Sequence, residues 1–227
     1  FETRRRDRRE RHVYTYRNYY NGGGGARGDL SGDGLPELML TANQRDAGGN
    51  RLYLNEGQFR FRDVTAEAGV RGTGFWATGV SFAAVNGDGR LDIYVCYAGP
   101  KAGARRANEL FINLGLNAHG VPTFREQAAA FGIADQGFAT HAAFFDYDRD
   151  GDLDLYLVNN SSQPPSILAR ENTRDVRDSL GGADKLYRND GGHFVDVSAQ
   201  AGIFGSEIGF GLGVAVSDVN RDGWPDL

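Results

Sequence analysis

The sequence has one cysteine, Cys96, and only 6 prolines in 227 residues. A single cysteine excludes an intrachain disulfide, which fits a cytosolic protein and equally an exported one that is stabilised by bound metal. No run approaches the roughly 18 apolar residues of a membrane-spanning helix, and no signal-peptide pattern stands at residue 1. We therefore expect no transmembrane segment in this chain. Because the sequence begins at Phe1 rather than at methionine, the missing signal says nothing about export.

Charge is unevenly spread along the chain. The net charge is −5, yet residues 1–12 carry six arginines against three acids. Such a run can contact nucleic acid, but its own acids interrupt the positive field and no aromatic platform accompanies it. We interpret residues 1–19 as a flanking basic segment and expect no nucleic-acid partner.

Catalytic motifs are also missing. There is no G-x-S-x-G, no HExxH and no paired cysteine and histidine. We therefore expect a binding module rather than an enzyme. The alternative is part of a polysaccharide-acting enzyme whose catalytic residues lie outside this segment.

Glycine is abundant, with 33 residues, and aromatic residues make up 11% of the chain. This profile indicates many tight turns between short packed strands rather than disorder.

An internal repeat organises the chain. The segments DLSGDGLPEL, AVNGDGRLDI, DYDRDGDLDL and DVNRDGWPDL begin at residues 29, 84, 146 and 218. A second pattern recurs between them, as in RLYLNEGQFRFRDVTAEAGV and KLYRNDGGHFVDVSAQAGI. Each unit reads as four short strands; in the second unit these are 77–85, 91–97, 109–113 and a run around Phe124.

Repeated four-stranded antiparallel units predict an all-β fold, a β-propeller. A β-sandwich with coincidental turns is the alternative. We expect about three blades, at residues 20–70, 71–133 and 134–203, followed by the opening strand of a fourth within 204–227. Because three blades cannot close a ring, we expect a part of a longer propeller.

The acidic segments resemble the first part of an EF-hand loop. In the third, carboxylates occupy positions 1, 3, 5 and 9, a glycine permits the turn at position 6, and the carbonyl of position 7 can face inward. Hard oxygen ligands on alternate residues of a tight loop suit calcium. An Asp/Gly-rich turn that binds nothing is the alternative, but clustered carboxylates repel one another strongly without a cation.

We predict three to four structural Ca²⁺ sites, with no catalytic residue. The third and fourth loops are complete, the first has substitutions at positions 3 and 9, and the second lacks an acid at position 1. We expect the second loop to be empty or completed by water. The predicted ligands are Asp29, Ser31, Asp33, Leu35 and Glu37; Asn86, Asp88, Arg90 and Asp92, after Ala84; Asp146, Asp148, Asp150, Asp152 and Asp154; and Asp218, Asn220, Asp222, Trp224 and Asp226.

These loops, after a Gly-Phe strand, resemble the FG-GAP (VCBS) repeat of integrin α-chain propellers. The LYRNDGGHFVDVSAQAGI type of segment resembles the ASPIC/UnbV (cartilage acidic protein-like) group, over about residues 13–227. The resemblance implies a seven-bladed propeller with calcium loops between the first two strands of each blade. It also implies an exported protein: extracellular, at the cell surface or periplasmic. With the expected calcium dependence, it favours binding of a protein or glycan ligand.

Overall fold

The structure is a computed structural model that describes residues 22–42, 49–72, 76–99, 106–161, 163, 176–178 and 181–227. The predicted basic segment 1–19 lies outside these ranges. None of the helices in the described ranges has the length and apolar character needed to cross a membrane.

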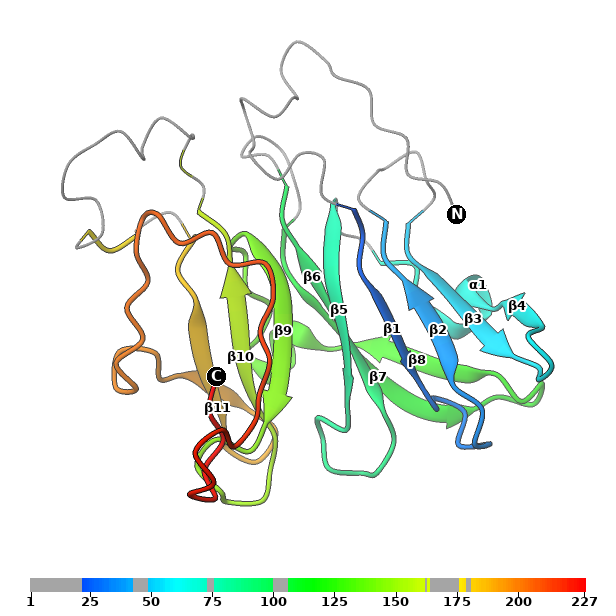
Figure 1. Cartoon of the computed structure of the whole chain (residues 1–227). Helices are drawn as coiled ribbons and strands as arrows, with labels where there is room; N and C mark the ends of the chain where they lie inside the picture. Colours follow the sequence, from blue (N-terminus) through cyan, green and yellow to red (C-terminus); the bar gives the residue numbers. More distant parts are fainter. Residues whose placement is uncertain are drawn as a thin grey trace, which may run out of the picture.

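Within the described ranges, twelve strands form three four-stranded antiparallel sheets, each a simple meander in chain order (Figure 1). The first sheet contains β1 (Gly25–Gly28), β2 (Glu37–Leu40), β3 (Arg51–Asn55) and β4 (Phe61–Asp63). The second contains β5 (Ala77–Ala83), β6 (Asp92–Tyr97), β7 (Glu109–Leu116) and β8 (Pro122–Glu126). The third contains β9 (Ala139–Phe145), β10 (Asp154–Asn159), β11 (Lys185–Asn189) and β12 (Phe194–Asp196).

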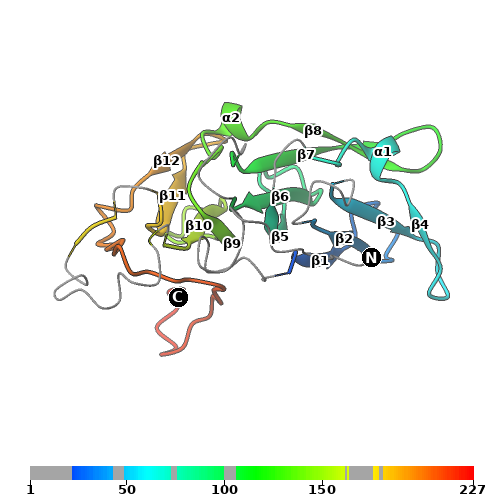
Figure 2. The ribbon, with the colours of Figure 1, turned by 90° about the horizontal axis from the view of Figure 1, so that it is seen from above.

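The first strands of the sheets lie side by side, β5 between β1 and β9. From above, the later strands of each sheet extend away from this line toward the rim (Figure 2). Single-turn helices, α1 (Thr65–Ala68) and α2 (Ala128–Phe131), follow the last strands of the first two sheets. This arrangement confirms the predicted all-β fold with successive four-stranded propeller blades.

Strand β6 of the second sheet is buried on both faces. All six residues of β6 are buried, and side chains alternate between faces along a strand. Ile93 and Val95 join a core cluster shared with the first sheet. Tyr94 and Cys96 join a cluster shared with the third sheet. Continuous apolar runs in the sequence therefore correspond to sheets stacked against a neighbour on each side.

Residues 204–227 differ from the prediction of an opening strand. They contain no strand, although Gly211 occupies the expected place. The Thr140 hydroxyl donates to the Gly211 carbonyl at 2.9 Å, just as the Thr78 hydroxyl donates to the Ala139 carbonyl at 2.6 Å. A strand requires a continuous ladder, and within the described residues only the isolated pairs of Phe210 with Asn160, Ser206 with Arg177 and Ser217 with Asp226 form.

Candidate metal-binding loops

The four acidic loops all lie at the same end of the sheets, the lower end in Figure 1. The first three connect β1 to β2, β5 to β6 and β9 to β10. The fourth, residues 218–226, is closed by mutual backbone hydrogen bonds between Ser217 and Asp226. The first three loops occupy equivalent positions because β1, β5 and β9 each run into their loop in the same direction.

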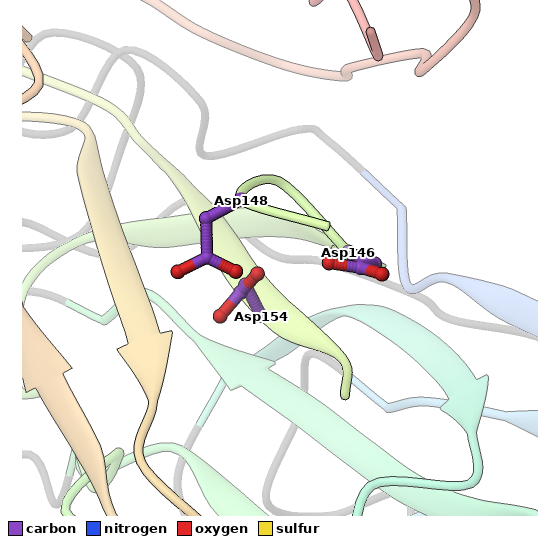
Figure 3. A group of neighbouring side chains, drawn as sticks. All are labelled: Asp146, Asp148 and Asp154. Atoms are coloured by element: carbon purple, nitrogen blue, oxygen red, sulfur yellow. The ribbon is translucent and has the colours of Figure 1, made fainter. Parts of the chain in front are cut away.

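The third loop brings three carboxylates together. One carboxylate oxygen each from Asp146, Asp148 and Asp154 lies within 4.8 Å of the others (Figure 3). Oxygens bound to one calcium ion at 2.3–2.6 Å are separated by up to about 5 Å, so this spacing fits such an ion. Among the residues that the structure describes, this is the one acidic group so closely gathered. The predicted ligand Asp150 stands outside it, and its Oδ1 accepts the Asp152 backbone N–H at 3.1 Å.

The electrostatics of this loop favour a cation. Burial raises the pKa of Asp154 to about 6, and the charges of Asp148 and Asp152 add to the effect, while backbone N–H donors oppose it. The Oδ1 atoms of Asp148 and Asp152 are buried with no hydrogen-bond partner among the described residues. These oxygens have lost water without gaining a donor, which is costly unless a cation faces them.

The aspartate at position 1 also closes the loop. Asp146 accepts the backbone N–H groups of Asp150 and Gly151, each at 3.1 Å. Asp29 and Asp218 accept the N–H groups at the same two positions of their own loops, at 2.8–3.1 Å, and Asp29 also accepts the Gly32 N–H at 2.7 Å. A carboxylate has about four acceptor sites, so these bonds leave room for a metal ion.

Every loop has two residues in the left-handed backbone region, at positions 4 and 6. They are Gly32 and Gly34, Gly87 and Gly89, Arg149 and Gly151, and Arg221 and Gly223, with φ between 64° and 100°. The sequence pattern identified only position 6. Position 4 was missed because arginine occupies it in the third and fourth loops, where a non-glycine residue at positive φ is strained.

The first loop closes with a buried glutamate. Glu37 is fully buried, and its Oε2 accepts the backbone N–H groups of Leu30 at 2.7 Å and Ser31 at 3.0 Å. Its Oε1 is buried without a hydrogen-bond partner among the described residues, and burial raises its pKa. Predicted ligands Ser31 and Asp33 lie on the same turn, where the Ser31 hydroxyl donates to Asp29 and Asp33 accepts the Leu35 N–H.

In the second loop an arginine side chain of the loop itself pairs with the central aspartate. Nη2 of Arg90 lies 2.6 Å from Oδ2 of Asp88, and Nε donates to the Asn113 carbonyl at 3.2 Å. The Asn86 amide also donates to Asp88, at 3.0 Å. The pKa of Asp88 is lowered, first by the Arg90 backbone N–H and also by its guanidinium. Asp92 is fully buried and accepts two backbone N–H groups.

The fourth loop repeats the backbone pattern at the surface. The Val219 N–H donates to Asp226 at 2.9 Å, and the Trp224 N–H donates to Asp222 at 2.8 Å. Asn220 links to Asp222 through both atoms of its amide group. The Trp224 ring lies 5.1 Å from the Arg149 guanidinium, so the third and fourth loops contact each other.

A second set of residues that sequence reasoning missed supports these loops. Asn55, Asn113 and Asn189 end or interrupt the third strand of each sheet, and their side chains donate to the position-8 carbonyls Pro36, Leu91 and Leu153. The backbone N–H groups of Asn113 and Asn189 donate to the position-9 carboxylates Asp92 and Asp154, each at 2.8 Å. The Asn55 backbone N–H opposes the rise in the pKa of Glu37, the position-9 carboxylate of the first loop. The recurring Asn-x-Gly of RLYLNEG, ELFINLG and KLYRNDG is the signal that could have identified them.

Comparison with known proteins agrees with the resemblance predicted from these loops. Residues 29–95 match the FG-GAP-like repeat family. Cartilage acidic protein 1 of Mus musculus is 27% identical over 210 residues, which is 88% of this chain and 29% of that protein. The Xenopus tropicalis protein of the same name is 27% identical over 219 residues, which is 92% of this chain and 29% of that protein. Integrin alpha-7 of Mus musculus is 34% identical over 92 residues, which is 40% of this chain and 7% of the integrin. The chain spans less than a third of these proteins.

Proposed function

We propose that this FG-GAP-repeat propeller segment is a calcium-stabilised module that binds a protein ligand in an extracellular setting. The relatives are cartilage acidic protein 1 and integrin alpha-7, which supports an extracellular-type propeller. The observation that carries the metal assignment is the third loop, where three carboxylates meet and where Asp148, one of the three, and Asp152 each have an oxygen without a donor.

We assign calcium to three of the four loops. In the third, Asp146, Asp148 and Asp154 hold the ion, with the Asp152 carbonyl as a further ligand. In the first, the free Oε1 of Glu37 supports a site. In the fourth, the backbone bonds to Asp218 repeat those of the third loop.

The second loop is excluded from this assignment. Its position 1 is Ala84, and the Arg90 guanidinium already neutralises Asp88. A metal ion would have to displace that cation and would still lack one carboxylate. The Arg90–Asp88 ion pair thus gives a second reason, beside the missing acid at position 1, to expect no ion in the second loop.

The role of calcium is structural. With a dissociation constant of about 0.1 mM and about 1 mM free calcium, each site adds about 1.4 kcal/mol to the free energy of unfolding. At the far lower calcium of the cytosol this contribution vanishes. An extracellular, cell-surface or periplasmic location follows as part of the proposal.

Calcium titration of the melting temperature tests this proposal. Millimolar calcium should raise the melting temperature of the chelator-treated protein, and the Asp148→Asn variant should bind one ion fewer. The matched Asp88→Asn variant should keep the wild-type stoichiometry, because its loop holds arginine instead. An unchanged melting temperature from chelator to millimolar calcium would reject the metal assignment.

The enzyme alternative makes a different prediction. If the full-length protein cleaved a polysaccharide, and mutations outside the acidic loops abolished turnover, the binding role would be wrong. A glycan ligand bound without cleavage would keep the module but change its partner class.

A further inference from the structure

The third and fourth acidic loops contact each other through one arginine and one tryptophan. The Arg149 guanidinium lies 5.1 Å from the centre of the Trp224 ring. Its Nη1 also lies close to Gly223, 3.6 Å from the point where a Cβ of that residue would stand. In Figure 1 the loop of residues 218–226 accordingly lies beside the connection between β9 and β10. Arg149 therefore reaches out of its own loop and onto the next one.

Arg149 occupies a backbone position that favours glycine. At position 4 the first two loops have Gly32 and Gly87, whereas the third and fourth have Arg149 and Arg221, with φ of 64° and 66°. A long side chain in the left-handed region costs conformational energy that glycine avoids. The contact with Trp224 is a gain that a glycine at position 149 could not supply.

The fourth loop is otherwise held by bonds within itself. In the part of the chain that the structure describes, the hydrogen bonds of residues 218–226 all have partners within 217–226. Residues 218–224 are exposed. The stacking of Trp224 on Arg149 therefore fixes this loop against the third one, and the position of Trp224 depends on where the third loop holds its arginine.

Both ends of the contact adjoin predicted calcium ligands. Arg149 directly follows Asp148, one of the three gathered carboxylates, whose Oδ1 has no donor among the described residues. Trp224 offers the carbonyl at position 7 of the fourth loop, and its N–H donates to Asp222 at 2.8 Å. An ion in the third loop fixes the turn that carries Arg149, and an ion in the fourth loop fixes Trp224. Each ion therefore favours the conformation in which the two loops are in contact.

We propose that the contact between Arg149 and Trp224 couples the two loops, so that calcium bound at one strengthens calcium binding at the other. The inference rests on the proposed calcium sites and identifies how two of them are regulated. An exposed cation–π contact corresponds to about a two- to fivefold change in affinity. Thermodynamic linkage makes this factor the same in both directions.

Charge alone predicts coupling of the opposite sign. The third loop has five carboxylates, and a bound divalent ion makes the loop less negative. A second ion would then be attracted less strongly to the neighbouring fourth loop. The sign of the measured coupling therefore separates a structural link through Arg149 from repulsion between the two ions.

The test follows Trp224 by fluorine NMR in the full chain labelled with fluorotryptophan. The third loop should fill first, because its carboxylates are already gathered. Asp148→Asn, which disables the third loop, should raise the calcium concentration at the midpoint of the Trp224 signal about two- to fivefold. In an Arg149→Gln background, Asp148→Asn should no longer raise this midpoint. Arg125→Gln, an equal charge change at an exposed residue of β8, should preserve the effect of Asp148→Asn.

Two results would overturn the inference. One is a midpoint that Asp148→Asn leaves equal or lowers. The other is a rise that persists in the Arg149→Gln background. Calorimetry counts the calcium ions bound by the wild type in the same conditions, so ions bound at both loops without coupling would leave the metal assignment intact. If calorimetry finds no ion at these loops, the proposed calcium role fails, and the coupling fails with it.

Discussion

The backbone N–H of Asn189 donates to Oδ1 of Asp154 at 2.8 Å, which ties the third acidic loop to the neighbouring strand β11. The Asn189 side chain adds bonds to Leu153 at 3.2 Å and from Gly192 at 2.7 Å. One buried asparagine thus positions the closing carboxylate of the loop and the turn beside it.

Asn189→Ala should therefore destabilise the protein by about 1–3 kcal/mol, because it leaves the Leu153 carbonyl and the Gly192 N–H without partners. It should also weaken calcium binding at the third loop. Asn55→Ala should cost less stability, since the equivalent amide bond of Asn55 to Pro36 is exposed to water, although Asn55 supports the first loop in the same way. Urea unfolding with and without calcium measures both effects. Unchanged calcium binding by Asn189→Ala would contradict the positioning role of Asn189.

The pH dependence of the metal-free protein follows from Asp154, whose pKa burial raises to about 6. The folded state then holds this proton more tightly than the unfolded state, where the pKa is about 3.9. Stability from this group is present below about pH 4, declines as the pH rises toward 6, and levels off above it.

Melting temperatures in chelator from pH 4 to 7 measure this effect. Other carboxylates titrate in the same range, so the relevant quantity is the difference between wild type and Asp154→Asn. This difference should favour the wild type more at the acid end of the range. A difference that does not change with pH would show that Asp154 has an ordinary pKa.

The Arg90 contact predicts how the second loop can be converted into a calcium site. The double variant Ala84→Asp/Arg90→Ser restores the missing carboxylate and removes the competing guanidinium, so it should bind one calcium ion more than the wild type. Ala84→Asp alone should add no ion at the same calcium concentration, because Arg90 still holds Asp88. Isothermal titration calorimetry gives the stoichiometry. If the single variant gained a full site, the arginine would not be the obstacle.

A substitution at Gly151, whose φ is 100°, tests whether the loops require a left-handed backbone at position 6. Nothing lies within 4 Å of a Cβ placed there, so Gly151→Ala changes conformational preference without a steric clash. We expect a loss of about 1–2 kcal/mol and weaker calcium binding. Gly213→Ala is the control, since Gly213 has equal space and no positive φ. A similar stability for both variants would argue against a conformational requirement.

The repeat predicted the four-stranded units and the acidic loops because strand alternation and turn residues are local properties of the sequence. In the second unit the predicted strands 77–85 and 91–97 correspond closely to β5 and β6. The Arg90 contact could not be predicted in this way, because it depends on the Asn113 carbonyl, which a different strand brings into reach. The left-handed backbone at position 4 could not be predicted either, because an arginine such as Arg149 gives no local sign of it.

Strand β6 supplies one wall of two different cores, with Val95 on one side and Tyr94 on the other. Loss of order in the second sheet would expose apolar surface of both neighbouring sheets at once. An opening event in the middle of this array therefore propagates in two directions, whereas fraying of β4 affects one sheet. The backbone amides of β6 should accordingly be the most strongly protected from hydrogen exchange. Their exchange rate should be set by the opening of all three sheets together.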